Sequence, residues 1–211
     1  MACTGPFEKY LDEYEDWFEK HRYVYLSEIE AVRHFIPQRS KGIEIGIGTG
    51  RFALPFGITE GVEPAKAMRE FSSKLGLKVH PGVAEKLPLA DGSFDFVLMV
   101  TTICFVDDIL QSFREANRIL NTNDRFIIGM VDRNSPLGKQ YEKIKKQNKF
   151  YRIATFYSVD EVVVSLNKTG FGNIEMVQTV FGDPELIDEI QAFQSGQGQG
   201  GFVVIKANKR F

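Results

Sequence analysis

Cysteine, histidine and surplus charge are all scarce in this chain of 211 residues. Its two cysteines, Cys3 and Cys104, provide neither a disulfide framework nor a zinc-ligand pattern, which favours a reduced, cytoplasmic compartment. The three histidines stand far apart in the sequence, so no metal site is expected. The formal net charge of -2 gives no positive field that would attract nucleic acid, so we do not expect a nucleic-acid partner.

Long apolar runs are missing as well. No segment approaches the ~20 apolar residues that a membrane-spanning helix needs, and residues 1–21 carry too many charges for a signal peptide. We therefore expect no membrane association. The length and the 43% hydrophobic content suit a single domain with a sizeable core, and they leave the oligomeric state open.

Short apolar segments alternate with helical patterns through most of the chain. Strands are expected at 42–47, 58–63, 77–82, 94–101 and 125–131, and later at 173–181 and 201–207. Helices are expected near the N-terminus, at 27–35 and 64–75, from 107 or 108 to 120, at 158–168 and from 183 onward. The Gly-rich segment 194–201 is predicted to be a loop. This alternation predicts an α/β fold with a doubly wound, mostly parallel seven-stranded sheet.

Three glycines follow the first expected strand at alternate positions. Gly46, Gly48 and Gly50 would let backbone amides approach a ligand closely, and Glu44 stands beside them. A dinucleotide-binding turn would have its third glycine where this chain has Arg51, and no Gly-Lys-Ser/Thr follows for a phosphate loop. The acid at this turn favours a nucleoside-like ligand that carries some positive charge.

A second acid, Glu63, ends the second expected strand. Carboxyl ends of parallel strands share one edge of the sheet, so Glu63 should lie near the glycine turn. A carboxylate only accepts hydrogen bonds and can take two donors at once, which suits a pair of ribose hydroxyls. Two acids around one glycine turn are a more specific signal than the glycines alone.

Four ordered motifs resemble those of class I S-adenosylmethionine-dependent methyltransferases. They read EIGIGTG, GVEP, GVAEKLPLADGSFDFVLM and EANRIL, and the resemblance covers residues 41–131. It is closest to the small-molecule enzymes of the methyltransferase type 11 group. The resemblance implies a Rossmann-like methyltransferase fold, S-adenosyl-L-methionine as the cofactor and S-adenosyl-L-homocysteine as its product.

The resemblance also implies a role for each matched position. The implied cofactor contacts are Glu44, Gly46, Gly48 and Gly50 for the methionine part, Glu63 for the ribose, Ala84 or Glu85 for the adenine edge, and the carbonyl of Thr101 for the methionine ammonium. One departure concerns the adenine, because relatives often have Asp where this chain has Val83. Glu85 is the candidate substitute for that missing carboxylate.

Similar enzymes also suggest how the rest of the chain is organised. Residues 1–38 are expected to form an N-terminal helical lid, in which Tyr14 or Tyr25 would contact the cofactor, since aromatic faces attract cations. A cofactor-binding core would span 39–132, an insertion for the substrate 133–157, and the C-terminal helices with the last two strands 158–211. Asp132, just past the fifth strand, is the acid we predict to orient a substrate.

The predicted activity is methyl transfer to a small acceptor, which would be an amine, a phenol or a carbon acid. The segment VTTICF after the fourth strand lacks the Asn/Asp-Pro-Pro-Tyr pattern of enzymes that methylate DNA or amide nitrogens. Two alternatives remain open. The basic segment 139–152 could serve an RNA or protein methyltransferase, and the fold could also belong to a catalytically silent binding module.

Overall fold

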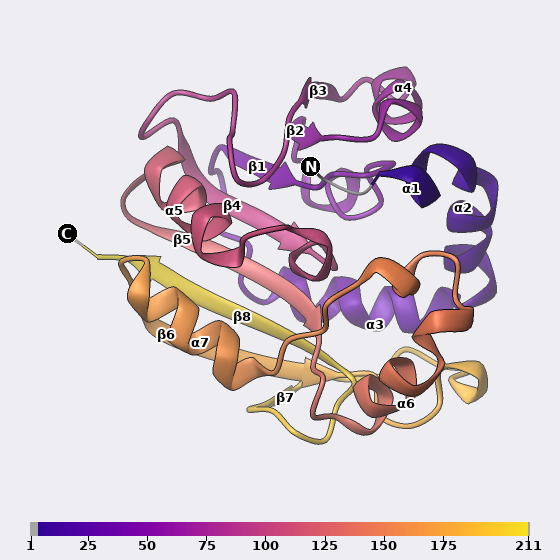
Figure 1. Ribbon diagram of the computed structural model, residues 1–211. Coiled ribbons are helices and arrows are strands. Elements are labelled where there is room, and N and C mark those ends of the chain that lie inside the picture. Colours follow the sequence, from indigo (N-terminus) through magenta and orange to yellow (C-terminus); the bar gives the residue numbers. More distant parts are fainter. Residues whose placement is uncertain (1–3, 211) are drawn as a thin grey trace.

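The computed structural model describes residues 4–210, and its centre is one sheet of eight strands (Figure 1). The strands are β1 (Gly42–Ile45), β2 (Glu60–Glu63), β3 (Lys78–Pro81), β4 (Phe94–Val100), β5 (Leu120–Val131), β6 (Phe171–Thr179), β7 (Gln194–Ser195) and β8 (Phe202–Lys209). Their order across the sheet is β3-β2-β1-β4-β5-β8-β6-β7. The pairs from β3 to β5 are parallel, and β8, β6 and β7 join by antiparallel pairing.

The mostly parallel α/β fold is confirmed, but the prediction of seven strands is short by one. The eighth strand, β7, lies in the segment expected to be a loop and pairs with the edge of β6, where Ser195 faces Val177. It is two residues long and both residues are exposed, so it carries no pattern of apolar side chains by which the sequence could reveal it.

The helices are α1 (Gly5–Lys9), α2 (Leu11–Lys20), α3 (Arg22–Arg33), α4 (Lys66–Lys74), α5 (Ile109–Ile119), α6 (Pro136–Ile144) and α7 (Val159–Lys168). Short 3-10 turns are η1 (Leu54–Phe56), η2 (Ile103–Phe105), η3 (Lys145–Gln147), η4 (Tyr151–Ile153) and η5 (Pro184–Leu186). The expected caps are present, because Asp108 accepts a hydrogen bond at the start of α5 and Ser158 forms a capping box with Glu161 at the start of α7.

The helix expected from residue 183 onward is wrong, since the chain forms only the single turn η5 there. The start signal itself works, because the Asp183 side chain accepts a hydrogen bond from the backbone N–H of Glu185. Ile187 and Phe193 contact the core, but Leu186 is 78% exposed and Ile190 is 50% exposed. A helix draws most of its stability from a continuous buried face, which this segment does not form.

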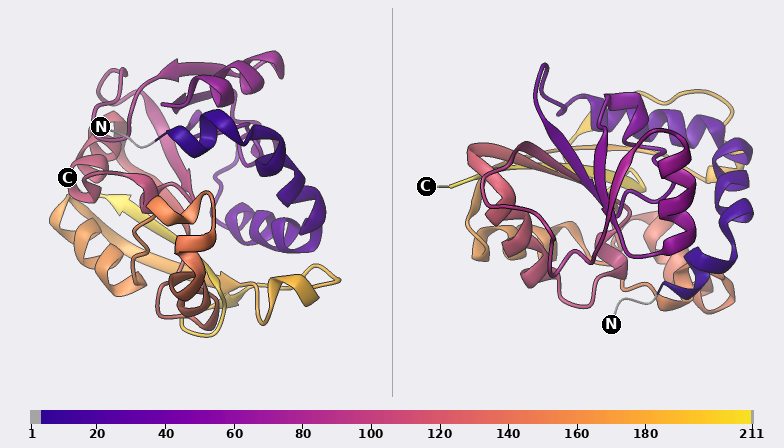
Figure 2. Two further views of the ribbon diagram at one scale, coloured as in Figure 1. Left: turned by 45° about the vertical axis from the view of Figure 1, so that its right-hand side comes forward. Right: turned by 90° about the horizontal axis from the view of Figure 1, so that it is seen from above.

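Helices cover both faces of the sheet. Along β4 the side chains alternate, with Val97 and Met99 packing on the face that α5 and α7 cover and Phe96 and Leu98 packing on the face that α3 covers. Figure 1 shows α5 and α7 in front of the sheet and α3 behind it, and the view from above in Figure 2 separates the two layers. Burial on both faces explains why β4 is almost continuously apolar.

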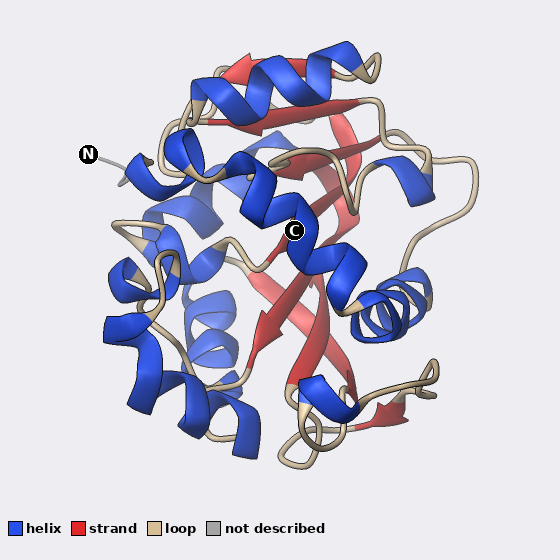
Figure 3. Ribbon diagram, turned by 90° about the vertical axis from the view of Figure 1, so that its right-hand side faces the viewer, coloured by secondary structure: helices blue, strands red, loops and turns tan. Residues whose placement is uncertain are grey.

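The strand order places a binding edge at the carboxyl ends of β1 and β4. The chain winds from β1 outward to β2 and β3 and then returns to the other side of β1 for β4, so crossovers leave these two neighbours in opposite directions. Such a switch point opens a crevice beyond the strand ends. Figure 3 looks onto this edge, and helices α1 and α2 run across it in front of the strands.

Candidate cofactor and substrate cavity

A cavity of about 460 Å³ lies at this edge. Its floor is formed by the ends of β1 and β4, and its cover by α1, α2 and the segment 136–153. Its size and its largely apolar walls with a few polar groups are typical of small-molecule sites. Of the predicted site residues, the following line it: Tyr14, Gly46, Gly48, Glu63, Ala84, Glu85 and Thr101.

The glycine turn meets the cavity through two of its three glycines. Gly46 and Gly48 both have left-handed backbones, with φ of 72° and 55°. A Cβ on Gly46 would lie 2.4 Å from Oγ1 of Thr102, and one on Gly48 would lie 3.2 Å from the hydroxyl of Tyr14. Gly50 is outside the cavity lining, and its missing side chain makes room for Leu77, whose Cδ1 would be 2.5 Å from a Cβ there.

Glu63 holds the turn in place from the end of β2. One carboxylate oxygen accepts a hydrogen bond from the N–H of Gly48 at 3.0 Å, and the other accepts one from the N–H of Ala65 at 2.8 Å. Burial raises the pKa of Glu63, and these two hydrogen bonds lower it in part. Each oxygen keeps a second lone pair, so the carboxylate can still accept hydrogen bonds from a ligand.

Glu44 lies behind the same turn with no partner for one of its oxygens. The side chain is 2% exposed, and within the described part of the chain its Oε2 finds no hydrogen-bond donor. Burial raises the pKa of Glu44 well above its usual value, and the nearby charge of Glu63 raises it further. A buried carboxylate oxygen without a hydrogen bond costs free energy. Glu44 does not line the cavity, so a cation bound in front of the turn would stabilise its charge through space and not by direct contact.

Tyr14 comes from α2 and reaches the turn from above. Burial raises its pKa first, and the charges of Glu44 and Glu63 add to the effect, so its hydroxyl stays protonated and can donate a hydrogen bond. Tyr25, the alternative contact, is outside the cavity lining, and its hydroxyl donates to the backbone carbonyl of Arg51 at 2.5 Å. The structure therefore brings Tyr14, and not Tyr25, to the cavity.

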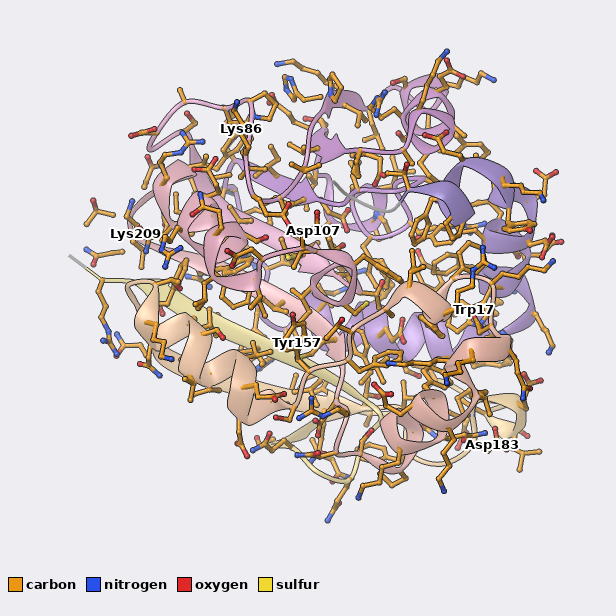
Figure 4. All side chains as sticks on the ribbon, viewed as in Figure 1. Trp17, Lys86, Asp107, Tyr157, Asp183 and Lys209 are labelled. Carbon is orange, nitrogen blue, oxygen red and sulfur yellow. The ribbon has the colours of Figure 1, made fainter. Side chains whose placement is uncertain are left out.

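Ala84 and Glu85, the residues predicted to contact the adenine, also line the cavity, but one oxygen of Glu85 already accepts hydrogen bonds from the protein. Its Oε1 accepts hydrogen bonds from the backbone N–H groups of Asp107 and Asp108 at 2.6 and 3.2 Å. Figure 4 labels Asp107, just ahead of α5. Ala84 lies beside Glu85 in the lining, and so does Val83, the position where relatives often have Asp. Glu85 thus ties this loop to α5 and keeps one oxygen for a ligand.

Thr101 follows the last residue of β4 and has an unusual conformation. It is a non-glycine residue with φ of 47°, which costs energy for a β-branched side chain. Its N–H donates to the carbonyl of Gly129 at 2.8 Å, so the pairing with β5 continues up to the kink. Strain of this kind gathers at functional sites, where it aims a backbone group in a direction that a regular strand does not allow.

Known proteins resemble this chain in sequence and in fold. A family model described as a methyltransferase domain matches residues 43–128. A SAM-dependent methyltransferase of Thermotoga maritima, a possible histamine N-methyltransferase, is 48% identical with a TM-score of 0.96, and the match covers 99% of this chain and 100% of that one. The chain belongs to the SAM-dependent methyltransferase family. The methyl donor of this methyltransferase is S-adenosyl-L-methionine.

Two further proteins place the methyltransferase among its relatives. An uncharacterized protein of Methanocaldococcus jannaschii is 43% identical over 203 residues, which covers 96% of this chain and 98% of that one. Geranyl diphosphate C-methyltransferase of Streptomyces coelicolor A3(2), solved with S-adenosyl-L-homocysteine, has a TM-score of 0.63 at 16% identity, covering 86% of this chain and 77% of that one. At that identity the likeness shows the fold alone.

Asp132, the predicted substrate-orienting acid, is not brought to the cavity. It is buried, and its Oδ1 accepts hydrogen bonds from the N–H groups of Asn134 and Val159 at 3.1 and 3.3 Å. The neighbouring residue Val131 does line the cavity. Asp132 therefore fastens the start of α7 to the end of β5, and we leave it out of the proposed site.

The methyltransferase has a second group of cavity residues that the sequence reasoning missed. We call Trp17, Glu28, Leu137, Tyr141 and Tyr151 the distal pocket, since these residues come from α2, α3, α6 and η4 and not from the cofactor motifs. A signal for one of them exists. Glu28 interrupts a helix face on which Val24, Ala31 and Val32, three or four positions away, are buried and apolar.

Three further sequence predictions concern a metal site, a membrane-spanning helix and the basic segment 139–152. In the described part of the chain, no cluster of three or more His, Cys, Asp or Glu could hold a metal ion. None of the helices seen between residues 4 and 210 is long and apolar enough to cross a membrane. Two lysines of the basic segment 139–152 form ion pairs: Lys145 pairs with Glu142, and Lys149 pairs with Glu13 of α2.

Proposed function

We propose that this chain transfers the methyl group of S-adenosyl-L-methionine to a small acceptor, an amine, a phenol or a carbon acid, inside the covered cavity. The observation that supports a small acceptor is the cover over the binding edge. Glu13 of α2 pairs with Lys149 at 2.5 Å, and Lys20 pairs with Glu185 at 2.8 Å. These ion pairs join the N-terminal helices to the segments 136–153 and 183–186 above the cavity.

The donor half of the cavity fits the cofactor chemically. A Cβ would collide with Thr102 at Gly46 and would be tight against Tyr14 at Gly48, so both positions offer bare backbone. Glu63 offers acceptors suited to ribose hydroxyls. The partnerless oxygen of Glu44, behind the same turn, favours a positive ligand in front of it. We propose Thr101, Ala84 and Glu85 as further contacts. Gly50 would act through packing only.

When bound, S-adenosyl-L-methionine supplies an activated methyl group. The task left to the chain is to align the two reactants and exclude water, which can be worth ~7–11 kcal/mol. Tyr14 and the helices around it would do both, because they cover the cavity and lie beside Gly48 of the glycine turn. We propose that residues 1–38, of which the structure describes 4–38, form the lid over the cavity.

The test is turnover of S-adenosyl-L-methionine with purified protein and a panel of amines, phenols and carboxylates. Histamine belongs in the panel because the Thermotoga maritima relative is a possible histamine N-methyltransferase. Release of S-adenosyl-L-homocysteine that depends on one acceptor supports the proposal. Cofactor binding without turnover, across the whole panel and with tRNA and peptides added, would identify a silent module. Turnover with only tRNA or peptide would replace the small acceptor.

A further inference from the structure

Glu28 occupies a position in the distal pocket where a carboxylate is costly. It is only 7% exposed, and it lies on the buried face of α3 between Val24 and Val32. No group in residues 4–210 donates a hydrogen bond to it, although buried polar side chains are normally paired. Because it lines the cavity, the small exposed part of the carboxylate faces the ligand space.

The electrostatic surroundings of Glu28 offer no compensation. The titratable groups that interact with it are phenols, Tyr25 on its own helix, Tyr141 on α6 and Tyr151 on η4. The acids Asp183 and Glu185 act on Tyr141 from the next segment, and no basic side chain among the described residues acts on Glu28. Burial alone raises the pKa of Glu28 to about 8.

Aromatic rings surround this acid. The rings of Tyr141 and Tyr151 pack with centroids 5.0 Å apart, and Trp17 lines the same pocket with one face stacked on His21 at 4.8 Å. Figure 4 shows Trp17 on the side of the molecule that also carries Asp183. Ring faces attract cations, most strongly when water is excluded. A lone carboxylate among aromatic rings therefore favours an ammonium ion as the ligand.

The alternatives fit these observations less well. A phenol or alcohol would satisfy Glu28 with one hydrogen bond, but it would bring no charge to offset the buried acid. A carboxylate substrate would place a second negative charge beside Glu28. A purely structural role would be served better by an apolar residue, which costs nothing to bury on this face of α3.

We propose that the methyl acceptor is a small primary or secondary amine, held as an ammonium ion between Glu28 and the rings of Trp17, Tyr141 and Tyr151, and that Glu28 accepts its proton. This assignment rests on the proposed methyltransferase function and specifies its substrate class. It makes Glu28 a catalytic residue, because its carboxylate touches the reacting nitrogen. The residues proposed for the donor and those of the distal pocket line one cavity, together with Thr101 and Val131.

The proton balance requires a base of this kind. The ammonium proton passes to a carboxylate oxygen of Glu28, and the nitrogen regains its electron pair. The nitrogen then bonds to the methyl carbon while the carbon–sulfur bond breaks, and that bonding pair stays on sulfur as a neutral thioether. The methylated nitrogen carries the positive charge, and Glu28 releases its proton to solvent when the products leave.

Binding can be tested separately from activity. Thermal stability of the wild-type protein is measured with S-adenosyl-L-homocysteine, and then with primary amines bearing alkyl, phenyl and imidazolyl groups, each beside the alcohol of the same skeleton. We expect at least one amine to raise the melting temperature further and its alcohol to fail. Equal shifts for amine and alcohol, or no shift from any amine, would overturn the amine assignment. Failure of S-adenosyl-L-homocysteine itself would overturn the proposed function instead.

Glu28→Gln tests the role of the carboxylate, and Glu30→Gln is the matched control because Glu30 is exposed on the same helix and pairs only with Arg33. We expect Glu28→Gln to keep the shift with S-adenosyl-L-homocysteine, to lose the shift with the amine, and to lower kcat/KM by ~100-fold or more. Its activity should rise only near the amine's own pKa, whereas the wild type should gain activity at lower pH. Wild-type kcat/KM and an unchanged pH profile in Glu28→Gln would refute the proposal.

Discussion

Arg51 joins the glycine turn to helix α2 through Glu15. Its Nε and Nη2 both donate to Oε2 of Glu15, at 3.0 and 2.6 Å, and its Nη1 donates to Glu19 at 3.1 Å. The Arg51 and Glu15 side chains are 26% and 18% exposed, so water screens this pair only in part. Arg51 occupies the position where a dinucleotide-binding turn would have glycine, and it uses that position to hold the lid.

Arg51→Ala should weaken cofactor binding. Without the guanidinium, α2 loses its charged tether and Tyr14 is no longer held beside Gly48, so we expect the affinity for S-adenosyl-L-homocysteine to fall roughly 10-fold, about what a charge-assisted hydrogen bond contributes. Isothermal titration calorimetry measures this. Arg114→Ala, an exposed arginine on α5, is the control and should bind like the wild type. An unchanged affinity in Arg51→Ala would show that the tether has no role in binding.

Glu63→Ala should weaken cofactor binding by ~1–3 kcal/mol, because a ligand hydroxyl loses its acceptor. Calorimetry with S-adenosyl-L-homocysteine gives the number, and the melting temperature without ligand reports the separate loss of the hydrogen bonds to Gly48 and Ala65. Glu70→Ala is the matched control, since that acid is 62% exposed on α4. If Glu63→Ala binds with wild-type affinity, Glu63 does not contact the cofactor.

The donor half of the site could be predicted from the sequence because its parts follow one another closely along the chain. Glu44, Gly46 and Gly48 belong to one strand and its turn, and Glu63 ends the next strand. Parallel strands align their ends at one edge without further information. The sheet itself was predictable for the same reason, since alternating apolar segments reveal each buried strand locally.

The distal pocket could not be predicted in this way. Glu28, Tyr141 and Tyr151 come from three helical segments, and only the packing of α3 against α6 and η4 brings them together. Asp132 shows a different limit. Successive side chains of a strand point in opposite directions. Val131 therefore lines the cavity, while Asp132, one residue later, points into the packed interior beside Val159.

Cofactor binding should release protons from Glu44. The pKa of Glu44 is raised well above its usual value in the empty protein, so the group retains its proton to a higher pH than a solvated glutamate. A bound cation favours the carboxylate and lowers that pKa, so the proton leaves. Calorimetry of S-adenosyl-L-methionine binding in two buffers with different ionisation enthalpies counts the protons. Glu44→Gln should show none of this release, and an equal proton count in both proteins would contradict the assignment.

Stability should depend on pH through Glu28. Its folded-state pKa is about 8 and its ordinary value 4.5, so the folded state binds more protons than the unfolded state between these values. The contribution of Glu28 to stability is therefore fully present below pH 4.5 and is lost as the pH rises through 8. Glu28→Gln cannot titrate, so the difference in the free energy of unfolding between Glu28→Gln and the wild type should rise by roughly 2 kcal/mol or more from about pH 5 to 9.

Urea unfolding at the two pH values measures this difference, and Glu30→Gln should show no such trend. A constant difference between Glu28→Gln and wild type would mean that Glu28 titrates like a solvated acid.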